Sequence, residues 1–319
     1  MPLWRQESVA QKQRREMQAA SLKALEMGNI PLEAKHRLEA QKLGGDRFFT
    51  SDLTCNEYLL TRQAGYEPIG LVMGTAFYKV SFWGYFGRYQ TFTGELSALS
   101  HAQLAARELA VSRMRQEAAL LGATGVIGVR LLLGGYDWSS RTVEFTVIGT
   151  AIRVKNRPDD TEPFTSALSG QEFWQLHQAG YWPKGLVFGV CSYYVHGNYN
   201  TQAVMNNSWW RGGWANQELT QYTQGFQSAR HLAMNRLTED IHRHKAEGAV
   251  GMDIDANIED IEYEINDRKY HDLLAHFVAV GTAIVQDDQP IQTPPKSPLL
   301  LYNLASGKSE QLKKVDIQD

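Results

Sequence analysis

Residues 63–74 of the chain read QAGYEPIGLVMG, and residues 178–189 read QAGYWPKGLVFG. The likeness extends over residues 57–80 and 172–195 at a constant offset of 115, with 12 of the 24 positions identical. Self-similarity of this length at one fixed offset indicates a duplicated segment. The stretch therefore predicts two copies of one fold, although it names no reaction.

Two further blocks recur in the same order. Residues 106–129 match 229–252 at an offset of 123, and FTVIGTAI at 145–152 matches FVAVGTAI at 277–284 at an offset of 132. The offset therefore grows once between the first strand and the helix, and once between the last two strands. Because loops tolerate insertions better than cores do, we expect both insertions in loops.

The duplication divides the chain into four segments. We expect an N-terminal helical segment at 1–50, a first domain at 51–156, a second domain at 170–286 and a flexible tail at 287–319. A chain of 319 residues suits two domains of ordinary size. The N-terminal segment is either an assembly arm or a solvated lead-in, and the tail carries a short apolar docking segment at 298–302.

Each copy has the pattern of a β-α-β-β unit, in which one helix covers one face of a three-stranded sheet. In the first copy we expect strands over 66–80, 126–133 and 141–154. The helix between them should begin at Ser100, with Gln103 as its capping-box partner.

That helix should end at Leu121-Gly122, because glycine readily adopts the left-handed conformation of a C-terminal cap. In the second copy we expect strands at 181–195, 249–258 and 275–285. The predicted fold class is α+β: two tandem β-α-β-β two-layer domains preceded by helices.

Composition and charge exclude several classes of protein. The hydrophobic fraction of 43% and the charged fraction of 21% are typical of a globular protein. A net charge of −3 gives no electrostatic case for binding nucleic acid or an anionic membrane. No apolar run approaches the roughly 18–20 residues that a membrane span needs.

The N-terminus and the cysteines favour a cytoplasmic protein. The first residues, MPLWRQESVAQKQRREMQ, contain no apolar stretch like that of a secretory signal. Only Cys55 and Cys191 are present, too few for a disulfide scaffold or a CxxC site. We expect two ordinary thiols.

A shared order of short motifs runs through both copies: GLV with a following glycine, then AR--A--RM--EA--LGA, GVIGVR and a closing GTA. The first copy carries them at Gly70-Leu71-Val72, Gly74, Ala106-Arg107, Ala110, Arg113-Met114, Glu117-Ala118, Leu121-Gly122-Ala123, residues 125–130 and Gly149-Thr150-Ala151. The second copy keeps Gly185-Leu186-Val187, Gly189, Ala229-Arg230, Ala233, Arg236, Gly248, Gly251 and Gly281-Thr282-Ala283.

This pattern resembles the YbjQ-like family of heavy-metal-binding domains, over about 52–155 and 170–286. The second copy departs from it at 242–244, where His-Arg-His replaces Ala-Leu-Leu. The resemblance implies a small β-α-β-β domain, like a dodecin subunit, that assembles as a five-fold ring. It implies no catalytic residues and no defined metal site, so a divalent heavy metal is suggested by the resemblance alone.

The residues themselves give little support to a metal site. Soft and borderline metals need Cys and His brought together, and no such ligand recurs at matched positions of the two copies. The nine histidines are His36, His101, His177, His196, His231, His242, His244, His271 and His276. We expect surface histidines, and metal sites built between chains stay open as an alternative.

A calcium-loop pattern is also present, with Asp253, Asp255, Asn257 and Glu264 at positions 1, 3, 5 and 12. Position 6 requires glycine, and Ile258 stands there. The alternation of apolar and polar residues predicts a half-buried strand instead.

No catalytic motif is found in its structural context, whether GxSxG, P-loop, HExxH or dinucleotide fingerprint. The glycines at 122–128 lead from a helix into a strand, whereas a phosphate loop leads into a helix. Cys191 replaces Ala76 of the first copy and is not a shared nucleophile. The sequence therefore favours a protein that is not an enzyme.

Each copy inserts aromatic residues between its first strand and its helix, more than one small domain can bury. Large rings dominate interface energetics, so a subunit interface is our first interpretation, with intramolecular packing and a ligand groove as alternatives. The candidates are Trp83, Tyr85, Phe86, Trp209, Trp210 and Trp214.

Two matched arginines, Arg107 and Arg230, are further interface candidates, and Arg113 and Arg236 lie six positions beyond them. Six residues do not share one helix face, so the two pairs should have separate partners. Salt bridges to neighbouring domains and solvated side chains are both open.

The resulting hypothesis is a cytoplasmic, non-enzymatic, ring-forming assembly or binding protein of five identical chains. The alternatives are heavy-metal sequestration or sensing between domains or subunits, and an enzyme with an interfacial active site. No cofactor is identified. Other protein partners could bind through the N-terminal helices or the tail.

Overall fold

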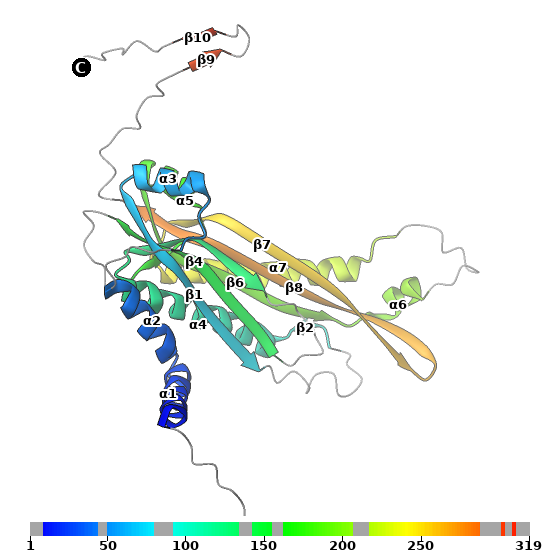
Figure 1. Cartoon of the computed structure of the whole chain (residues 1–319). Helices are drawn as coiled ribbons and strands as arrows, with labels where there is room; N and C mark the ends of the chain where they lie inside the picture. The colour runs from blue at the N-terminus through cyan, green and yellow to red at the C-terminus, as the bar shows by residue number, and fades with distance from the viewer. Residues whose placement is uncertain are drawn as a thin grey trace, which may run out of the picture.

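The computed structural model has two four-stranded β-sheets and two long helices, with further helices at the N-terminus (Figure 1). It is an α+β fold preceded by helices, as predicted. The structure describes residues 9–43, 50–79, 92–133, 142–154, 162–206, 217–287, 301–303 and 308–310.

The first sheet has the strand order β1-β4-β3-β5. β1 (Tyr66–Lys79), β4 (Thr142–Val154) and β3 (Gly125–Leu133) are antiparallel neighbours from the first repeat. β5 (Phe164–Thr165) comes from the start of the second repeat and pairs with β3 in parallel.

The helix α4 (Ser97–Leu121) covers one face of this sheet with small and medium apolar residues. The approach is close at Gly74, where a Cβ atom would overlap the carbonyl of Ala110. Gly122 ends the helix in the left-handed conformation, with φ of 72°, as the sequence predicts.

The second sheet has the order β2-β6-β8-β7. β6 (Tyr181–Val195), β8 (Arg268–Gln286) and β7 (Gly248–Ile265) belong to the second repeat, whereas β2 (Gly94–Glu95) comes from the first. Helix α7 (Thr220–Arg243) covers one face of this sheet. The short helix α6 (Tyr199–Met205) lies between β6 and α7 in the chain.

The two halves share details of pairing as well as strand order. The register shifts between Pro68 and Gly70 in β1 and between Pro183 and Gly185 in β6. The second shift lies between Ile127 and Arg130 in β3 and recurs at the matched positions of β7. The main difference is the β7–β8 hairpin, which extends through the insertion at 257–274 as continuous strand.

Hydrogen bonds before the first helix of each repeat also correspond. The amide of Asp52 donates to Thr150 Oγ1 at 3.0 Å, and the amide of Ala167 donates to Thr282 Oγ1 at 2.9 Å. The helices that follow, α3 (Cys55–Gln63) and α5 (Gly170–Gln178), both begin with a capping box.

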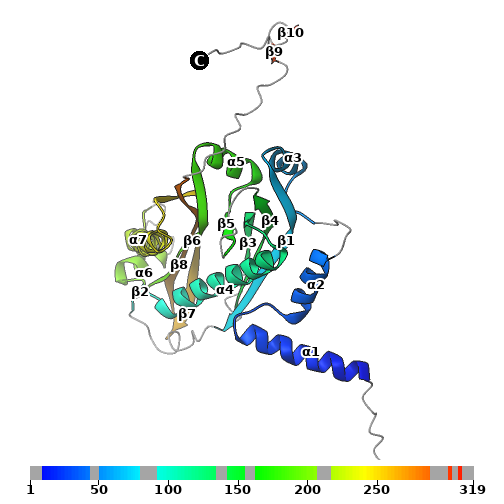
Figure 2. The same cartoon turned by 90° about the vertical axis from the view of Figure 1, so that its left-hand side faces the viewer.

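The N-terminal helices α1 (Val9–Glu26) and α2 (Leu32–Leu43) pack beside α4 through the buried residues Ile30 and Leu38. Figure 2 shows α4 between the two sheets, with α7 beyond the second sheet and α1 and α2 beside the first. Two short strands, β9 (Leu301–Asn303) and β10 (Lys308–Glu310), pair with each other.

Four predictions were wrong in detail. The insertion at 257–274 lies mostly in paired strands rather than in a loop, and His177 and His276 are buried rather than at the surface. Helix α4 begins at Ser97 rather than Ser100, and its N-cap is Leu96 without a capping side chain. Ser100 is instead buried, and its hydroxyl donates to the Leu96 carbonyl. The apolar side of β7 is not half-buried either: Ile254 and Ile258 are 53% and 52% exposed, because α7 does not reach them.

We expect Gly74→Ala to lower the free energy of unfolding by more than about 2 kcal/mol, because the new methyl group must push β1 away from α4. Urea unfolding measures the change. Glu67→Ala, on the same strand, is the control. It removes only an ion pair between side chains that are nearly half exposed and should cost below about 0.5 kcal/mol. A change at Gly74 as small as the control's would contradict the close packing.

Candidate functional site

The two halves of the chain meet through the second face of α4. Leu186, Phe188 and Val280, from the side of the second sheet opposite α7, belong to the same buried cluster as α4 residues such as Leu99 and Val111. Helix α4 therefore packs between two sheets, whereas α7 packs on one.

Each repeat also lends a strand to the other's sheet. Gly94 and Glu95 pair antiparallel with Tyr194 and Tyr193 at the edge of β6. The amide of Leu96 then donates to the Ser192 carbonyl at 2.8 Å. In return, β5 of the second repeat pairs with the edge of β3. Strand addition of this kind satisfies the backbone groups of both edges.

A bidentate ion pair fixes the β2 junction. Arg236 of α7 donates from Nη1 to Glu95 Oε1 at 2.5 Å and from Nη2 to Oε2 at 2.9 Å. It also donates to the Val190 carbonyl at 2.7 Å. Burial opposes ionisation of Glu95, but the hydrogen bonds from Arg236 and Ser100 outweigh it and lower the pKa of Glu95 below its ordinary value.

The matched arginine of the first repeat has no such carboxylate among the described residues. Arg113 donates to the Thr75 carbonyl at 2.5 Å, the counterpart of the Val190 bond, and to the Leu25 carbonyl of α1 at 3.0 Å. Its Nε is buried, and no acceptor lies within reach among the described residues. Burial lowers the pKa of Arg113, whereas the pairing with Glu95 raises that of Arg236.

The helix carboxylates show the duplication too. Glu117 accepts the amide of Met73 at 3.0 Å, and Asp240 accepts the amide of Phe188 at 3.0 Å. Both pairs are related by the repeat offsets. They hold the carboxyl half of each helix on the first strand of its sheet.

Arg107 is buried at the junction, whereas its counterpart Arg230 is exposed. The Arg107 guanidinium lies over the Phe145 ring, 4.7 Å from its centroid, and donates to the Gln103 carbonyl at 3.0 Å. A cavity of about 50 Å³ adjoins it, lined by both repeats: Arg107, Leu131, Phe145, Asp253, Asp255, Val278 and Val280.

His276 of β8 faces the same region. Its Nδ1 lies 2.8 Å from Ser192 Oγ, and burial together with the Arg107 charge lowers its pKa to about 3. The imidazole is therefore neutral near pH 7. It packs in the junction without adding a second cation beside Arg107.

A second junction lies at the other end of the sheets. The Tyr66 hydroxyl of β1 hydrogen-bonds Nδ1 of His177 in α5, and the Nε2 of His177 lies 3.2 Å from Asp287 Oδ2. The rings of Tyr66, Phe164, Phe173, His177 and Trp182 pack together between the repeats.

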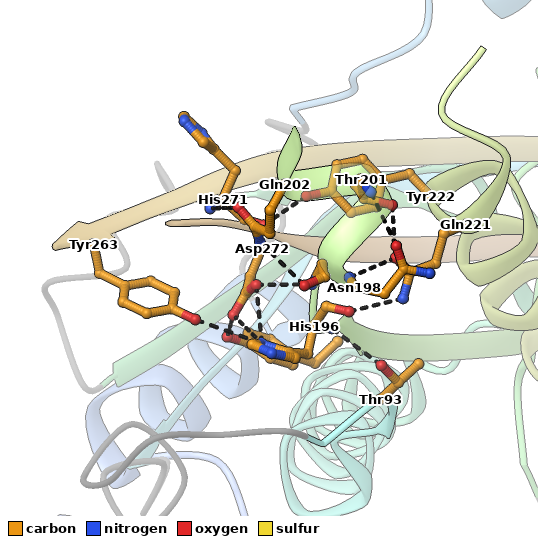
Figure 3. A network of polar contacts seen from close by, with 12 residues as sticks. Thr93, His196, Asn198, Thr201, Gln202, Gln221, Tyr222, Tyr263, His271 and Asp272 are labelled. Carbon is orange, nitrogen blue, oxygen red and sulfur yellow. Dashed lines mark hydrogen bonds and ion pairs between the residues drawn. The ribbon is translucent and has the colours of Figure 1, made fainter. Parts of the chain in front are cut away.

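A buried carboxylate organises the end of β6 next to β2 (Figure 3). Asp272 accepts hydrogen bonds from the Tyr194 hydroxyl and from the Gly197 amide at 2.9 Å, and it lies 3.2 Å from His196 Nδ1. The amide of His196 donates to Thr93 Oγ1 of the first repeat at 3.1 Å.

The rest of this network ties α6 and α7 to the hairpin. Gln202 bonds both the amide and the carbonyl of His271, at 2.9 and 2.6 Å, and the Tyr222 hydroxyl donates to the same carbonyl at 2.7 Å. Burial and Asp272 raise the pKa values of Tyr194 and Tyr222, so both hydroxyls stay protonated donors. The network holds the β6 edge in the shape that accepts β2.

The donor set does not fit a metal site. Among the described residues, no three His, Cys, Asp or Glu side chains come together in a way that could hold an ion. Cys191 is buried, and burial raises its pKa to about 12, so it is a neutral thiol and a poor ligand. The strand at 253–257 confirms that the calcium-loop pattern is accidental.

Two outer faces of the sheets carry exposed apolar side chains. On the first sheet Met73 and Phe77 are 46% and 63% exposed, and on the second sheet Met252, Ile254 and Ile258 are exposed. Large exposed apolar side chains gathered on one face mark an interaction surface. No helix in the described part of the chain is long and apolar enough to cross a membrane.

The sequence candidates have mixed outcomes. Trp83, Tyr85, Phe86, Trp209, Trp210 and Trp214 lie outside the described residues. Arg107 does lie at a domain junction, but over an aromatic ring. The ion pair across the junction is made by Arg236 with Glu95. Sequence reasoning missed Glu95, although Glu-Leu recurs at 218–219 at the helix offset of 123.

Comparison with known proteins places the fold in a family. Residues 60–155 match the YbjQ family model, whose description is "Putative heavy-metal-binding". The chain is 34% identical over 244 residues to the "Encapsulin nanocompartment protein Rv1762c" of Mycobacterium tuberculosis, covering 75% of this chain and 86% of the relative. No solved structure matches it significantly.

Glu95→Gln should lower the free energy of unfolding at pH 7 by about 1–3 kcal/mol, because it removes a charge-assisted bidentate pair. The folded-state pKa of Glu95 is depressed, so this stability is present above the ordinary carboxyl pKa and is lost as pH falls through the folded value. Urea unfolding from pH 7 to pH 3 should show the two proteins converging at acid pH; a constant gap would contradict the pair.

We expect Asp272→Ala to destabilise the second repeat by about 3 kcal/mol or more, because it leaves the Tyr194 hydroxyl and the Gly197 amide buried without their acceptor. The matched control is Asp260→Ala, which removes an exposed carboxylate facing His271 from the same hairpin. Equal thermal shifts for the two variants would show that the buried carboxylate does not organise this region.

Proposed function

This chain belongs to the YbjQ-like family, and we propose that it is a non-enzymatic protein that assembles with further copies of itself. The observation that carries the proposal is the pair of exposed apolar faces. Each corresponds, by the repeat offsets, to a face that is buried where the two halves of the chain meet. Met73 corresponds to the buried Phe188, and the exposed Ile254 corresponds to the partly buried Leu131.

The second half of the chain is, in this proposal, a second YbjQ-like domain. Its support is the common strand order, the matched register shifts and the matched Thr150 and Thr282 hydrogen bonds. The unit of assembly would then be the two-domain chain, with domains at 51–156 and 170–286.

We further propose a closed ring of five chains. Within one chain the two domains lie side by side through α4 and their sheets. This arrangement favours a single ring in which the two domain copies alternate, and it disfavours two stacked rings that are each made of one domain copy. The name of the mycobacterial relative, an encapsulin nanocompartment protein, supports a role in a multi-chain assembly. The aromatic insertions and Arg230 remain interface candidates. The cytoplasm is the proposed location, and the N-terminal helices and the tail are the proposed segments for binding other proteins.

Metal handling is the alternative, and it would require ligands from two chains, because the described residues of one chain do not form a site. Elemental analysis of the purified assembly distinguishes the two. Stoichiometric zinc, copper or nickel that survives dialysis and is lost when the assembly is dissociated would support metal handling. An enzyme with an interfacial active site would also depend on assembly, but no described constellation specifies a reaction.

Light scattering coupled to size exclusion should give about 180 kDa, five chains of 36.0 kDa. Phe77→Asp and Ile254→Asp should each lower this mass, because each puts a charge into a face that assembly buries. Tyr199→Asp is the control: Tyr199 is 87% exposed but lies on α6, outside both faces. A wild-type mass near 36 kDa would contradict the proposal.

A further inference from the structure

In each four-stranded sheet one edge strand pairs with a short added strand, and the corresponding edge of the other sheet has no such strand among the described residues. In the second sheet the outer edge of β6 carries β2, whereas the matching edge of β1 ends the first sheet. In the first sheet the outer edge of β3 carries β5, whereas β7 ends the second sheet. The repeat therefore specifies five strand positions in each sheet, and the described part of the chain fills four of them.

The segment that fits the open edge of β1 is present in the chain. Residues 217–219 match 94–96 at the helix offset, with Glu218 and Leu219 in the places of Glu95 and Leu96. Leu219 also has the same backbone conformation as Leu96, with φ and ψ of −86° and 75° against −84° and 72°. The Glu218 segment is thus shaped to join a strand edge, and Gln217 and Glu218 are exposed.

A partner for the Glu218 carboxylate is also present. Arg113 is the counterpart of Arg236, which holds Glu95, and Arg113 has a buried Nε without an acceptor among the described residues. The N-terminal helices supply only the Leu25 carbonyl to its Nη2. They bury Ile30 and Leu38 but leave Met73 and Phe77 exposed, so the described part of the chain does not cover the face of the first sheet opposite α4 at these two residues.

A second pair of charges corresponds in the same way. Where the two halves of one chain meet, which we call the filled junction, Arg107 lies near His276. By the repeat offsets, Arg107 corresponds to Arg230 and His276 corresponds to Glu144. Arg230 and Glu144 are both exposed, and their charges are opposite. Asp253 and Asp255 line the cavity beside Arg107. The first repeat does not offer the same acidic residues to Arg230, because Arg130 occupies the position that corresponds to Asp253. A contact between the exposed faces of two copies would therefore use the same residue positions as the filled junction, with different charges at those positions.

We propose that the second domain of one chain docks on the first domain of the next copy by the same interface that joins the two domains within a chain. Residues 217–219 then extend the first sheet of the neighbour along β1, Glu218 pairs with Arg113, and Arg230 faces Glu144. This inference rests on the proposed self-assembly and names its surface. The contact is heterologous, so each copy offers one face and accepts on the other.

The test reverses the Arg230 and Glu144 charges in the full-length protein. Arg230→Glu and Glu144→Arg should each raise the dissociation constant of the assembly at least about tenfold, equivalent to about 1.4 kcal/mol per contact. The double variant should regain most of the wild-type mass. Both residues are exposed, so neither change disturbs the fold of one chain. Arg268→Glu, at the exposed tip of the hairpin, is the charge-matched control.

The outcomes separate the two proposals. Loss of mass in both single variants with recovery in the double variant supports the reused interface. A full-mass assembly that tolerates either single reversal would overturn this inference while leaving self-assembly intact. A wild-type protein that stays monomeric would overturn the proposed function itself.

Discussion

The structure depends on a helix that packs on two sheets at once. Helix α4 covers its own sheet at Gly74 and, with its other face, buries Leu186 and Phe188 of the next one. Strand exchange through β2 and β5 then locks the two domains, and the Arg236–Glu95 pair fixes the register of β2 on β6. The interface between the two halves of the chain therefore combines apolar burial, backbone pairing and a bidentate ion pair.

The comparison of α4 with α7 also shows which surfaces of the chain are left uncovered. Helix α7 has the length and position of α4, yet no second sheet lies against it among the described residues, and Arg230, Ile254 and Ile258 are exposed as a result. In the first repeat, Arg113 is half-buried, its Nε is buried, and it lacks among the described residues the carboxylate that its counterpart holds. These features are costly for an isolated chain, and the proposed docking of a neighbouring copy would remove them. That is why assembly, rather than catalysis, is the function the geometry supports.

Much of the fold could be predicted from the sequence, because repetition shows where cores keep their length and where loops grow. Gly122 and the strand at 253–257 were placed correctly from local chemistry. The start of α4 was not, because Ser100 resembles a cap but is used to accept the Ser192 amide across the junction. The candidate site was predicted only in part. Arg107 was chosen by its match to Arg230, but no local pattern shows that Glu95 reaches Arg236, which lies 141 positions away.

Disulfide trapping tests the reused interface most directly. Glu95 pairs with Tyr193 in the filled junction, so Glu218 should pair with Tyr78 of the next copy, with Cα atoms roughly 4.5–5.5 Å apart and within disulfide reach. Two proteins are made in a Cys55→Ser background, one with Glu218→Cys and one with Tyr78→Cys. The account predicts disulfide-linked dimers only when the two are mixed and a ladder of linked chains when both changes share one chain. Dimers from either single variant alone, or no link in the mixture, would contradict it.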